Sequence, residues 1–418
     1  MDTQIQQTFE QLKQTISVST SPFHTAQEAL RQLSDAGFVI LDWDSTWELV
    51  PGGKYAVCPF GTTVFGFQIG TDLSDTPVWK LSSSHIDNPG FRIKYNPVVS
   101  SKNGCRLNTE VYGGAIYSTW LDRPLSIAGR IALKNPQSAH PRLKLLDFKR
   151  PVAVLPNLAI HLNRAMNDGV ALNAQTDLLP ICGMDEHMDT DTFLQILANE
   201  TGEKPEDILC FDLSVYHYAE PVRTGFSGDM FMAPRIDNIS SVQACLTGLI
   251  EANPSDGISV AVLFDHEEIG SRSKNGANGN LLSYTLERIC NALNISRESF
   301  LQSLVHSYYL SLDVAHAIHP AHPEKSDITS AMPLNRGFAI KASAKHAYCS
   351  DDDMTGVILQ LAARHHIACQ QNHMRNDIPG GSTDIGIPIY AMHSAMETAG
   401  MKDQYDLEAF MKAFYKEL

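Results

Sequence analysis

An apolar run that ends in acidic residues constrains this chain more than any other feature. Residues 258–264, ISVAVLF, predict a strand that is buried on both faces. Asp265, Glu267 and Glu268 follow this strand directly. Adjacent glutamates suit neither a core nor a strand end, but they suit a site where one carboxylate binds a metal ion and its neighbour moves a proton. Acidic pairs are also common on helix surfaces, so this pair needs support from the rest of the chain.

The composition limits the cellular setting. The chain has 418 residues, which predicts two domains or one domain with a large insertion. Its net charge of -15 argues against nucleic acid or an anionic membrane as a partner. The amino-terminal segment lacks the features of a signal peptide, and no apolar stretch approaches the ~20 residues that span a bilayer. Eight scattered cysteines without a CxxC pair favour reduced thiols, so we expect a cytoplasmic protein.

The order of the segments predicts one domain inserted into another. Residues 1–95 and 235–418 alternate strand-like and helical patterns, which is typical of an α/β sheet covered by helices on both faces. Residues 96–234 differ, because β-branched and aromatic runs there lie among many Pro, Gly and Asn residues. We interpret this middle part as a β-rich inserted domain. Its strand-like runs are 110–121, 150–162 and 207–218.

Five groups of polar residues fall at the ends of predicted strands or before a predicted helix. Sites in open α/β sheets gather beyond the carboxyl ends of strands, so these groups are expected to meet. Two histidines, two aspartates and a glutamate make up the side chains of a two-metal site, and mixed imidazole and carboxylate ligands suit zinc, or cobalt and manganese. The groups are His85 with Asp87, Asp237, Glu267 with Glu268, Asp313, and His393.

Each group also has an ordinary explanation. His85 and Asp87 fit a surface turn in which the aspartate caps a helix. Asp237, directly before a predicted helix, has the residue type of an N-cap. A single histidine such as His393 is more often half-buried and satisfied than a ligand. The five groups together favour a metal site over these separate explanations.

The chain resembles the aspartyl aminopeptidase / aminopeptidase I family of metallopeptidases. The resemblance runs nearly from end to end and keeps the order of the motifs. The matching segments are SPFHTAQEAL, WELVPGGKYAV, SSSHIDNPGFRIK, EVYGGAIYSTWLDRPLSIAGRI, LPNLAIHLNR, RIDNISS, LFDHEEIGS, SLDVAHAIHP, GFAIKASAKHAY, NDIPGGST and IPIYAMHSAMET.

This resemblance implies a fold and a metal centre. The fold would be a metallo-aminopeptidase catalytic domain, with a mixed sheet sandwiched by helices, and an inserted β-rich dimerisation domain. The cofactors would be two divalent ions per subunit, Zn²⁺ in the first place and Co²⁺ or Mn²⁺ as alternatives. His85 and Asp313 would bind one ion, Glu268 and His393 the other, and Asp237 would bridge them.

The resemblance also implies the reaction. The protein would remove acidic residues from peptide N-termini by attack of a metal-bound hydroxide. Glu267 would be the general base, and Asp87 would orient the His85 imidazole. Lys341 would bind the substrate's acidic side chain, for which a solvated strand lysine is the plain alternative.

Further residues are assigned by the resemblance alone. His316 and Tyr348 would lie near the substrate pocket. His161, in the inserted domain, would reach into the partner subunit's site and help to stabilise the tetrahedral intermediate. The assembly would be a dodecamer built from dimers.

One departure from the family leaves alternatives open. The family continues beyond Thr383 with a helix and a strand that are missing from this sequence, where Asp384 follows at once. If Lys341 were irrelevant, a broad-specificity aminopeptidase or a related amidohydrolase acting on N-acyl amino acids would fit. If the missing segment disabled the site, an assembling scaffold protein would fit.

Overall fold

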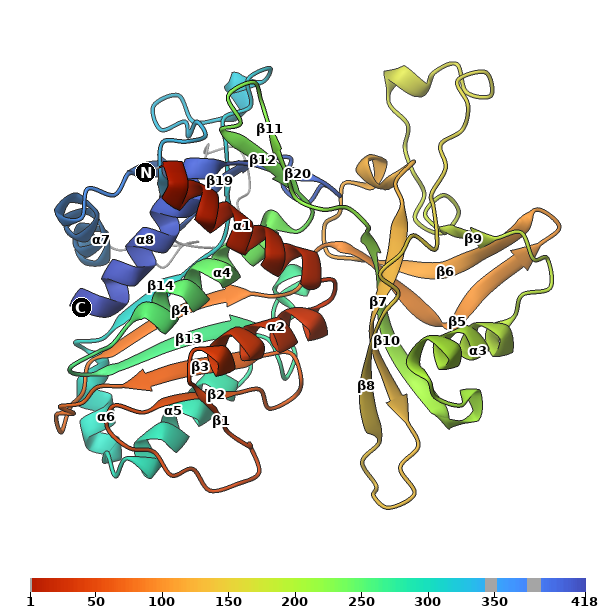
Figure 1. Cartoon of the computed structure of the whole chain (residues 1–418). Coiled ribbons are helices and arrows are strands. Elements are labelled where there is room, and N and C mark those ends of the chain that lie inside the picture. Colours follow the sequence, from red (N-terminus) through yellow and green to blue (C-terminus); the bar gives the residue numbers. More distant parts are fainter. Residues whose placement is uncertain (1, 343–351, 374–384) are drawn as a thin grey trace.

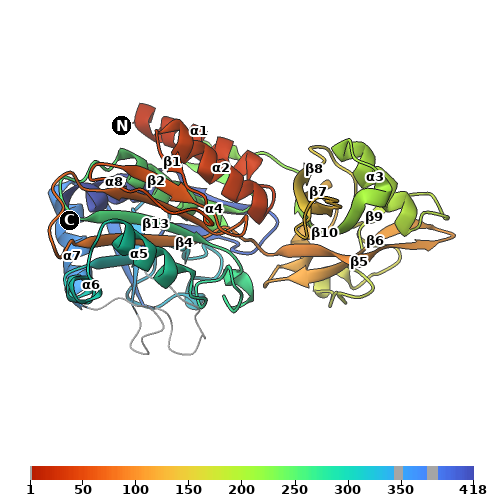
Figure 2. The same cartoon turned by 90° about the horizontal axis from the view of Figure 1, so that it is seen from below.

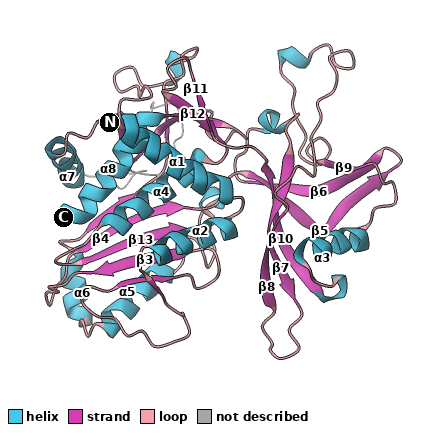
Figure 3. Ribbon diagram, viewed as in Figure 1, coloured by secondary structure: helices cyan, strands magenta, loops and turns pink. Residues whose placement is uncertain are grey.

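The computed structural model describes residues 2–342, 352–373 and 385–418. Two units lie side by side, a sheet covered by helices and a second unit made mainly of strands (Figure 1, Figure 3). The helices are α1 (Asp2–Val18), α2 (Pro22–Asp35), α3 (Thr190–Thr201), α4 (Ile236–Glu251), α5 (Leu281–Ala292), α6 (Arg297–Leu304), α7 (Asp352–Arg364) and α8 (Met401–Glu417).

The first unit contains a six-stranded mixed sheet in the order β1-β2-β3-β13-β4-β14. Strands β4, β13 and β14 run parallel, while β3 runs antiparallel to β13. These strands are β1 (Val39–Ile40), β2 (Lys54–Val57), β3 (Val64–Ile69), β4 (Trp79–His85), β13 (Ile258–Phe264) and β14 (Tyr308–Ser311).

Helices cover both faces of this sheet, as the sequence predicted. Along β13, Ala261 and Leu263 pack into a core shared with α1, α2, α4 and α8, while Val260 and Val262 pack into a second core with α5. Figure 2 shows α1 and α2 on one side of the sheet and α5 and α6 on the other. The alternation explains why the run is apolar throughout, because both faces of this central strand are buried.

The second unit is a six-stranded sheet in the order β8-β7-β10-β5-β6-β9. Helix α3 packs on it, capped at its start by Asp189, whose side chain accepts from Thr192 N, and ending at Gly202 in the left-handed conformation. The strands are β5 (Gly90–Ser101), β6 (Gly104–Tyr112), β7 (Leu125–Leu133), β8 (Arg142–Asp147), β9 (Ile181–Gly183) and β10 (Ile208–His217).

The limits of this sheet bear on the expected insertion. In sequence order, the first strand of this sheet is β5 and the last is β10. The strands that follow in the chain, β11 (Val222–Thr224) and β12 (Met230–Ala233), pair within the first unit. Their five-stranded sheet also contains β15 (Ala315–His316), β19 (Pro388–Tyr390) and β20 (Glu397–Gly400). Domain limits at residues 96 and 234 therefore stay a prediction.

Two runs that the sequence predicted as strands do not form one continuous strand each. Residues 150–162 form only isolated bridges, at Ala153, Val154 and Leu155, and the prolines at 151 and 156 explain this because they cannot donate to a ladder. The run 307–316 divides between β14 and β15, which belong to different sheets. A small third sheet of the first unit contains β16 (Phe338–Ala342), β17 (Cys369–His373) and β18 (Ile385–Gly386).

Membrane insertion was not expected from the sequence. Over the described ranges, every helix is too short or too polar to cross a bilayer.

Candidate metal centre

The carboxyl ends of three parallel strands carry most of the candidate site. Strand β4 ends at His85, which is paired in register with Phe264 at the end of β13, so the acidic run beginning at Asp265 follows beside it. Strand β14 ends two residues before Asp313. Asp237 lies in the first turn of α4, and His393 lies in the turn after β19. Residues from five distant stretches of sequence therefore converge at one edge of the sheet.

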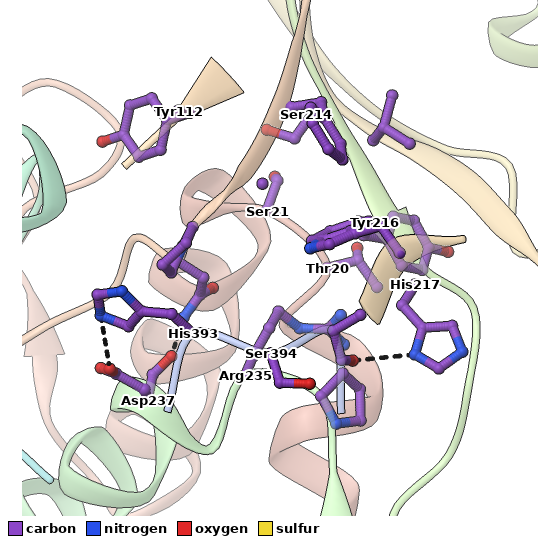
Figure 4. Close-up of a pocket in the computed structure, with 18 of the residues that line it drawn as sticks. Thr20, Ser21, Tyr112, Ser214, Tyr216, His217, Arg235, Asp237, His393 and Ser394 are labelled. Atoms are coloured by element: carbon purple, nitrogen blue, oxygen red, sulfur yellow. Dashed lines mark hydrogen bonds and ion pairs between the residues drawn. The ribbon is translucent and has the colours of Figure 1, made fainter. Parts of the chain in front are cut away.

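The five residues that the sequence suggested as ligands form two groups that share Asp237. In the first group, His85 Nε2 lies 3.4 Å from Asp237 Oδ1 and 3.6 Å from Asp313 Oδ1. In the second, His393 Nε2 lies 3.3 Å from Asp237 Oδ2 and 3.6 Å from Glu268 Oε1. The two oxygens of Asp237 thus face different imidazoles, and Figure 4 shows the side chains of His393 and Asp237 pointing toward each other.

Hydrogen bonds at the other ring nitrogen orient both imidazoles. His85 Nδ1 lies 3.0 Å from the backbone oxygen of Asp87, and His393 Nδ1 lies 3.2 Å from that of Gly114. Because a carbonyl oxygen only accepts, each Nδ1 carries the hydrogen. In a neutral ring, Nε2 then presents a lone pair to carboxylate oxygens, which is repulsive unless a cation is shared between them.

Without a metal ion, that cation is a proton. Burial alone would lower the pKa of His85, but its hydrogen bonds with Asp237 and Asp313 raise this pKa well above the usual range. The hydrogen bond with Asp237 raises the pKa of His393 to about 9. A bound metal ion would supply the same positive charge with both rings neutral.

The separations between these atoms fit zinc. Ligand atoms bound at 2.0–2.2 Å around a tetrahedral ion lie about 3.3–3.6 Å apart, and all four separations above fall in this range. Asp237 is 3% exposed, and apart from the contact with His85 Nε2 at 3.4 Å its Oδ1 accepts no hydrogen bond. A buried carboxylate oxygen of this kind normally has a hydrogen-bond donor or a cation as its partner. The surroundings of Asp237 therefore suit a metal ligand.

The two adjacent glutamates have different positions. Glu268 is turned into the second ligand group, and burial, followed by the charge of Asp237, raises its pKa to about 8. Glu267 has 37% of its side chain exposed, and its Oε2 lies 3.9 Å from His85 Nε2. Burial also raises the pKa of Glu267. The exposed member of the pair is the one that a substrate can reach.

The carboxylate of Asp87 accepts hydrogen bonds from the backbone of both glutamates. Its Oδ1 accepts from Glu267 N at 3.1 Å, and its Oδ2 accepts from Glu268 N at 3.2 Å. Tyr112 donates its hydroxyl to the same Oδ2 at 2.7 Å. Asp87 Oδ1 also lies 3.5 Å from His85 Nδ1, so one buried carboxylate touches three parts of the site.

Glu397 is a site residue that sequence reasoning missed. It lies in β20 and accepts from the backbone N–H of Asp237 at 3.0 Å and of His393 at 2.8 Å. Burial raises the pKa of Glu397 well above its usual range, and the charge of Asp237 adds to this effect. An acidic residue four positions after His393, in a run of small and apolar residues, was the available signal.

The remaining predicted residues lie around or away from this cluster. Lys341 is buried in β16, and its Nζ donates to Val314 O at 2.6 Å, one residue from Asp313. His316 is exposed in β15. His161 is exposed in the second unit, in the segment between β8 and β9. Tyr348 and the junction after Thr383 lie outside the described residues.

Comparisons with known proteins agree with this picture. The model of a family described as aminopeptidase I zinc metalloprotease (M18) matches residues 15–415. A "Probable M18 family aminopeptidase 2" from Clostridium acetobutylicum is 39% identical over 414 residues, covering 95% of this chain and 96% of the relative. A chain in the structure of the Ape4 and Nbr1 complex is similar with a TM-score of 0.93 at 28% identity, covering 98% of this chain and 86% of that chain. The mApe1 dodecamer of S. cerevisiae shares the fold, with a TM-score of 0.82 at 24% identity and coverage of 98% and 96%.

These findings identify the protein class as a zinc-dependent aminopeptidase, a hydrolase of peptide bonds. The chain belongs to the M18 family, the aminopeptidase I family of zinc metalloproteases. The resemblance found in the sequence and the expected α/β fold are both confirmed.

Proposed function

We propose that this aminopeptidase removes acidic residues from peptide N-termini, using two zinc ions. His85 and Asp313 would hold one ion, Glu268 and His393 would hold the other, and Asp237 would be shared between the two ligand groups. The shared position of Asp237 and the zinc-like separations of the ligand atoms support this assignment.

Zinc, when bound here, would polarise the scissile carbonyl and make a water molecule more acidic. Glu267 lies beside this position with its side chain partly exposed, so it would accept the proton of the attacking water. The same carboxyl then donates that proton to the leaving amine. Asp87 keeps Glu267 in place through the Glu267 backbone N–H, and it keeps the His85 ring oriented.

A buried lysine supports the acidic preference. Lys341 is 6% exposed, and its ammonium is held by the hydrogen bond to the backbone oxygen of Val314, the residue after Asp313. A substrate carboxylate would gain a charge-assisted hydrogen bond from Lys341, whereas a neutral side chain would not.

The test is Lys341→Met, with kcat/KM measured on aspartyl, glutamyl and alanyl substrates. Loss of one charge-assisted hydrogen bond, worth about 1.5–3 kcal/mol, lowers kcat/KM for the acidic substrates by roughly 10- to 100-fold and leaves the alanyl substrate little changed. Lys80→Met is the matched control, because Lys80 is also a buried strand lysine but lies at the start of β4. Equal loss on all substrates would refute the acidic preference, and no loss would favour the broad-specificity alternative.

We further propose that the active form is a cytoplasmic homo-oligomer, a dodecamer built from dimers. The second unit exposes apolar residues beside His161, including Leu162 at 76%, which suits burial against another subunit. His161 would then complete the partner's site. Inactive Glu267→Gln and His161→Ala proteins, refolded together, should regain activity through mixed dimers. If they do not, His161 has no role across subunits.

A further inference from the structure

We propose that the last residue of β6 and the two glycines after it, residues 112–114, form a clasp through which the second unit positions both ligand groups of the metal centre. This inference rests on the two-zinc function proposed above. Strand β6 belongs to the sheet of the second unit, between β5 and β9, while all five candidate ligands belong to the first unit. Tyr112 and His393 line the same pocket between the units (Figure 4).

Tyr112 positions the first ligand group through Asp87. Its hydroxyl donates to Asp87 Oδ2 at 2.7 Å, and Asp87 in turn lies 3.5 Å from His85 Nδ1. The Tyr112 ring is 9% exposed, and the guanidinium of Arg92 lies 4.5 Å from its centroid. Arg92 is itself paired with Asp212 in β10. The hydroxyl is therefore held by its own sheet and fixes the side chain of Asp87, whose backbone oxygen accepts from His85 Nδ1 and whose carboxylate lies beside the same ring.

The two following glycines position the second ligand group. Gly114 O accepts from His393 Nδ1, and Ile116 N donates to His393 O at 3.0 Å. A Cβ at position 114 would lie 3.1 Å from His393 Nδ1, which is tighter than ordinary contact. A Cβ at position 113 would lie 3.1 Å from Glu268 Cβ, and Gly113 has a φ of +66°. The backbone of the two glycines therefore packs directly against Glu268 and His393. Such close packing requires residues without side chains.

The clasp joins metal binding to the placement of the second unit. Hydrogen-bond partners behind metal ligands fix the imidazole orientation, and their loss typically weakens metal binding by about 10- to 100-fold. Tyr112 acts on the His85 group and Gly114 on the His393 group. Each is a positioning residue, because each acts through another side chain.

The experiment titrates Zn²⁺ into the metal-free full-length protein by calorimetry in competition with a chelator. Wild type should bind two ions, and His85→Ala and His393→Ala should each remove one step, which assigns the steps. Tyr112→Phe is expected to weaken the His85 step by about 10- to 100-fold, and Gly114→Ala to weaken the His393 step by a similar factor. In each variant the other step should weaken less, although Tyr112→Phe also touches it because Asp87 Oδ2 accepts from Glu268 N as well.

Matched controls separate positioning from general damage. Tyr216→Phe removes a hydroxyl of the same sheet that also donates to an aspartate, Asp147, at 2.8 Å. Gly356→Ala adds a methyl group in α7 where, among the described residues beyond the neighbouring helix backbone, no heavy atom lies within 4 Å. The proposal is overturned if Tyr216→Phe weakens zinc binding as much as Tyr112→Phe, if both steps weaken equally, or if neither changes. Tyr112→Phe removes one atom and keeps the test valid if Gly114→Ala does not fold. Absence of zinc binding by wild type would overturn the two-zinc function itself.

Discussion

The two units of the molecule treat polar side chains in opposite ways. The strand-rich unit from Gly90 to His217 buries an apolar core, and among its described residues no acidic, lysine or arginine side chain is fully buried. The helix-covered unit buries many, including Asp87, Asp237 and Glu397. Burying a charge costs free energy unless the charge is paired. The strand-rich unit avoids this cost, whereas the helix-covered unit carries it at the residues that form the site.

Buried charge alone does not identify the site, because α8 also buries carboxylates. Asp403 accepts from the backbone N–H groups of Asn335 and Gly337, and Glu408 accepts from Gln404 Nε2. The carboxylates around Asp237 instead face imidazole Nε2 atoms whose rings already donate elsewhere. A buried carboxylate with a fixed N–H donor is structural, whereas one that faces a lone pair requires a cation.

The largest expected effect comes from Asp237→Ala. Loss of the shared ligand should release at least one zinc ion and lower activity further than any other single change. Asp189→Ala is the control, because Asp189 caps α3 and its loss should cost about 1 kcal/mol of stability without changing zinc content. Zinc per subunit and turnover are measured for both variants. Two retained ions and ordinary turnover in Asp237→Ala would mean that Asp237 has only a structural role.

Glu267→Gln tests which of the two adjacent glutamates is the general base and which is a metal ligand. The amide has the same shape but cannot accept the proton of water, so turnover should fall by about 10² to 10⁴. Both zinc ions should remain, because the side chain of Glu267 is partly exposed while that of Glu268 is buried beside His393. Zinc content of the purified variant checks this, and loss of an ion would show that the roles of the two glutamates are reversed.

Glu408→Gln should have a smaller effect, on stability alone. Burial raises the pKa of Glu408 from 4.5 to about 7, so the folded protein holds a proton between these values that the unfolded chain has lost. Stability therefore falls as pH rises from 4.5 to 7, by at most about 3 kcal/mol. The uncharged glutamine removes this dependence. Thermal unfolding should show Glu408→Gln more stable than wild type at pH 8 and similar at pH 5, and equal Tm differences at both pH values would refute it.

The sequence predicted the parts of the site that depend on local pattern. The buried strand β13 and the polar residues after β4, β13 and β14 follow from apolar runs and from the rule that parallel strands end at one edge. Glu397 and Tyr112 were missed because their roles arise from contacts between distant segments. Nothing in their neighbouring residues shows which backbone or carboxylate they will meet.

The same reasoning explains the differences in the fold. Strands β11, β12 and β20 have three or four residues each, too few to show a period, so their common sheet could not be predicted. The strand-like composition of residues 150–162 was outweighed by two prolines.

The central claim is that one edge of the helix-covered unit holds two zinc ions bridged by Asp237. The most direct measurement is anomalous diffraction at the zinc edge from crystals of the purified protein. Two peaks are expected, one between His85 and Asp313 and the other between Glu268 and His393, each about 2.0–2.2 Å from a different oxygen of Asp237. A single peak, or peaks that do not contact Asp237, would contradict the claim.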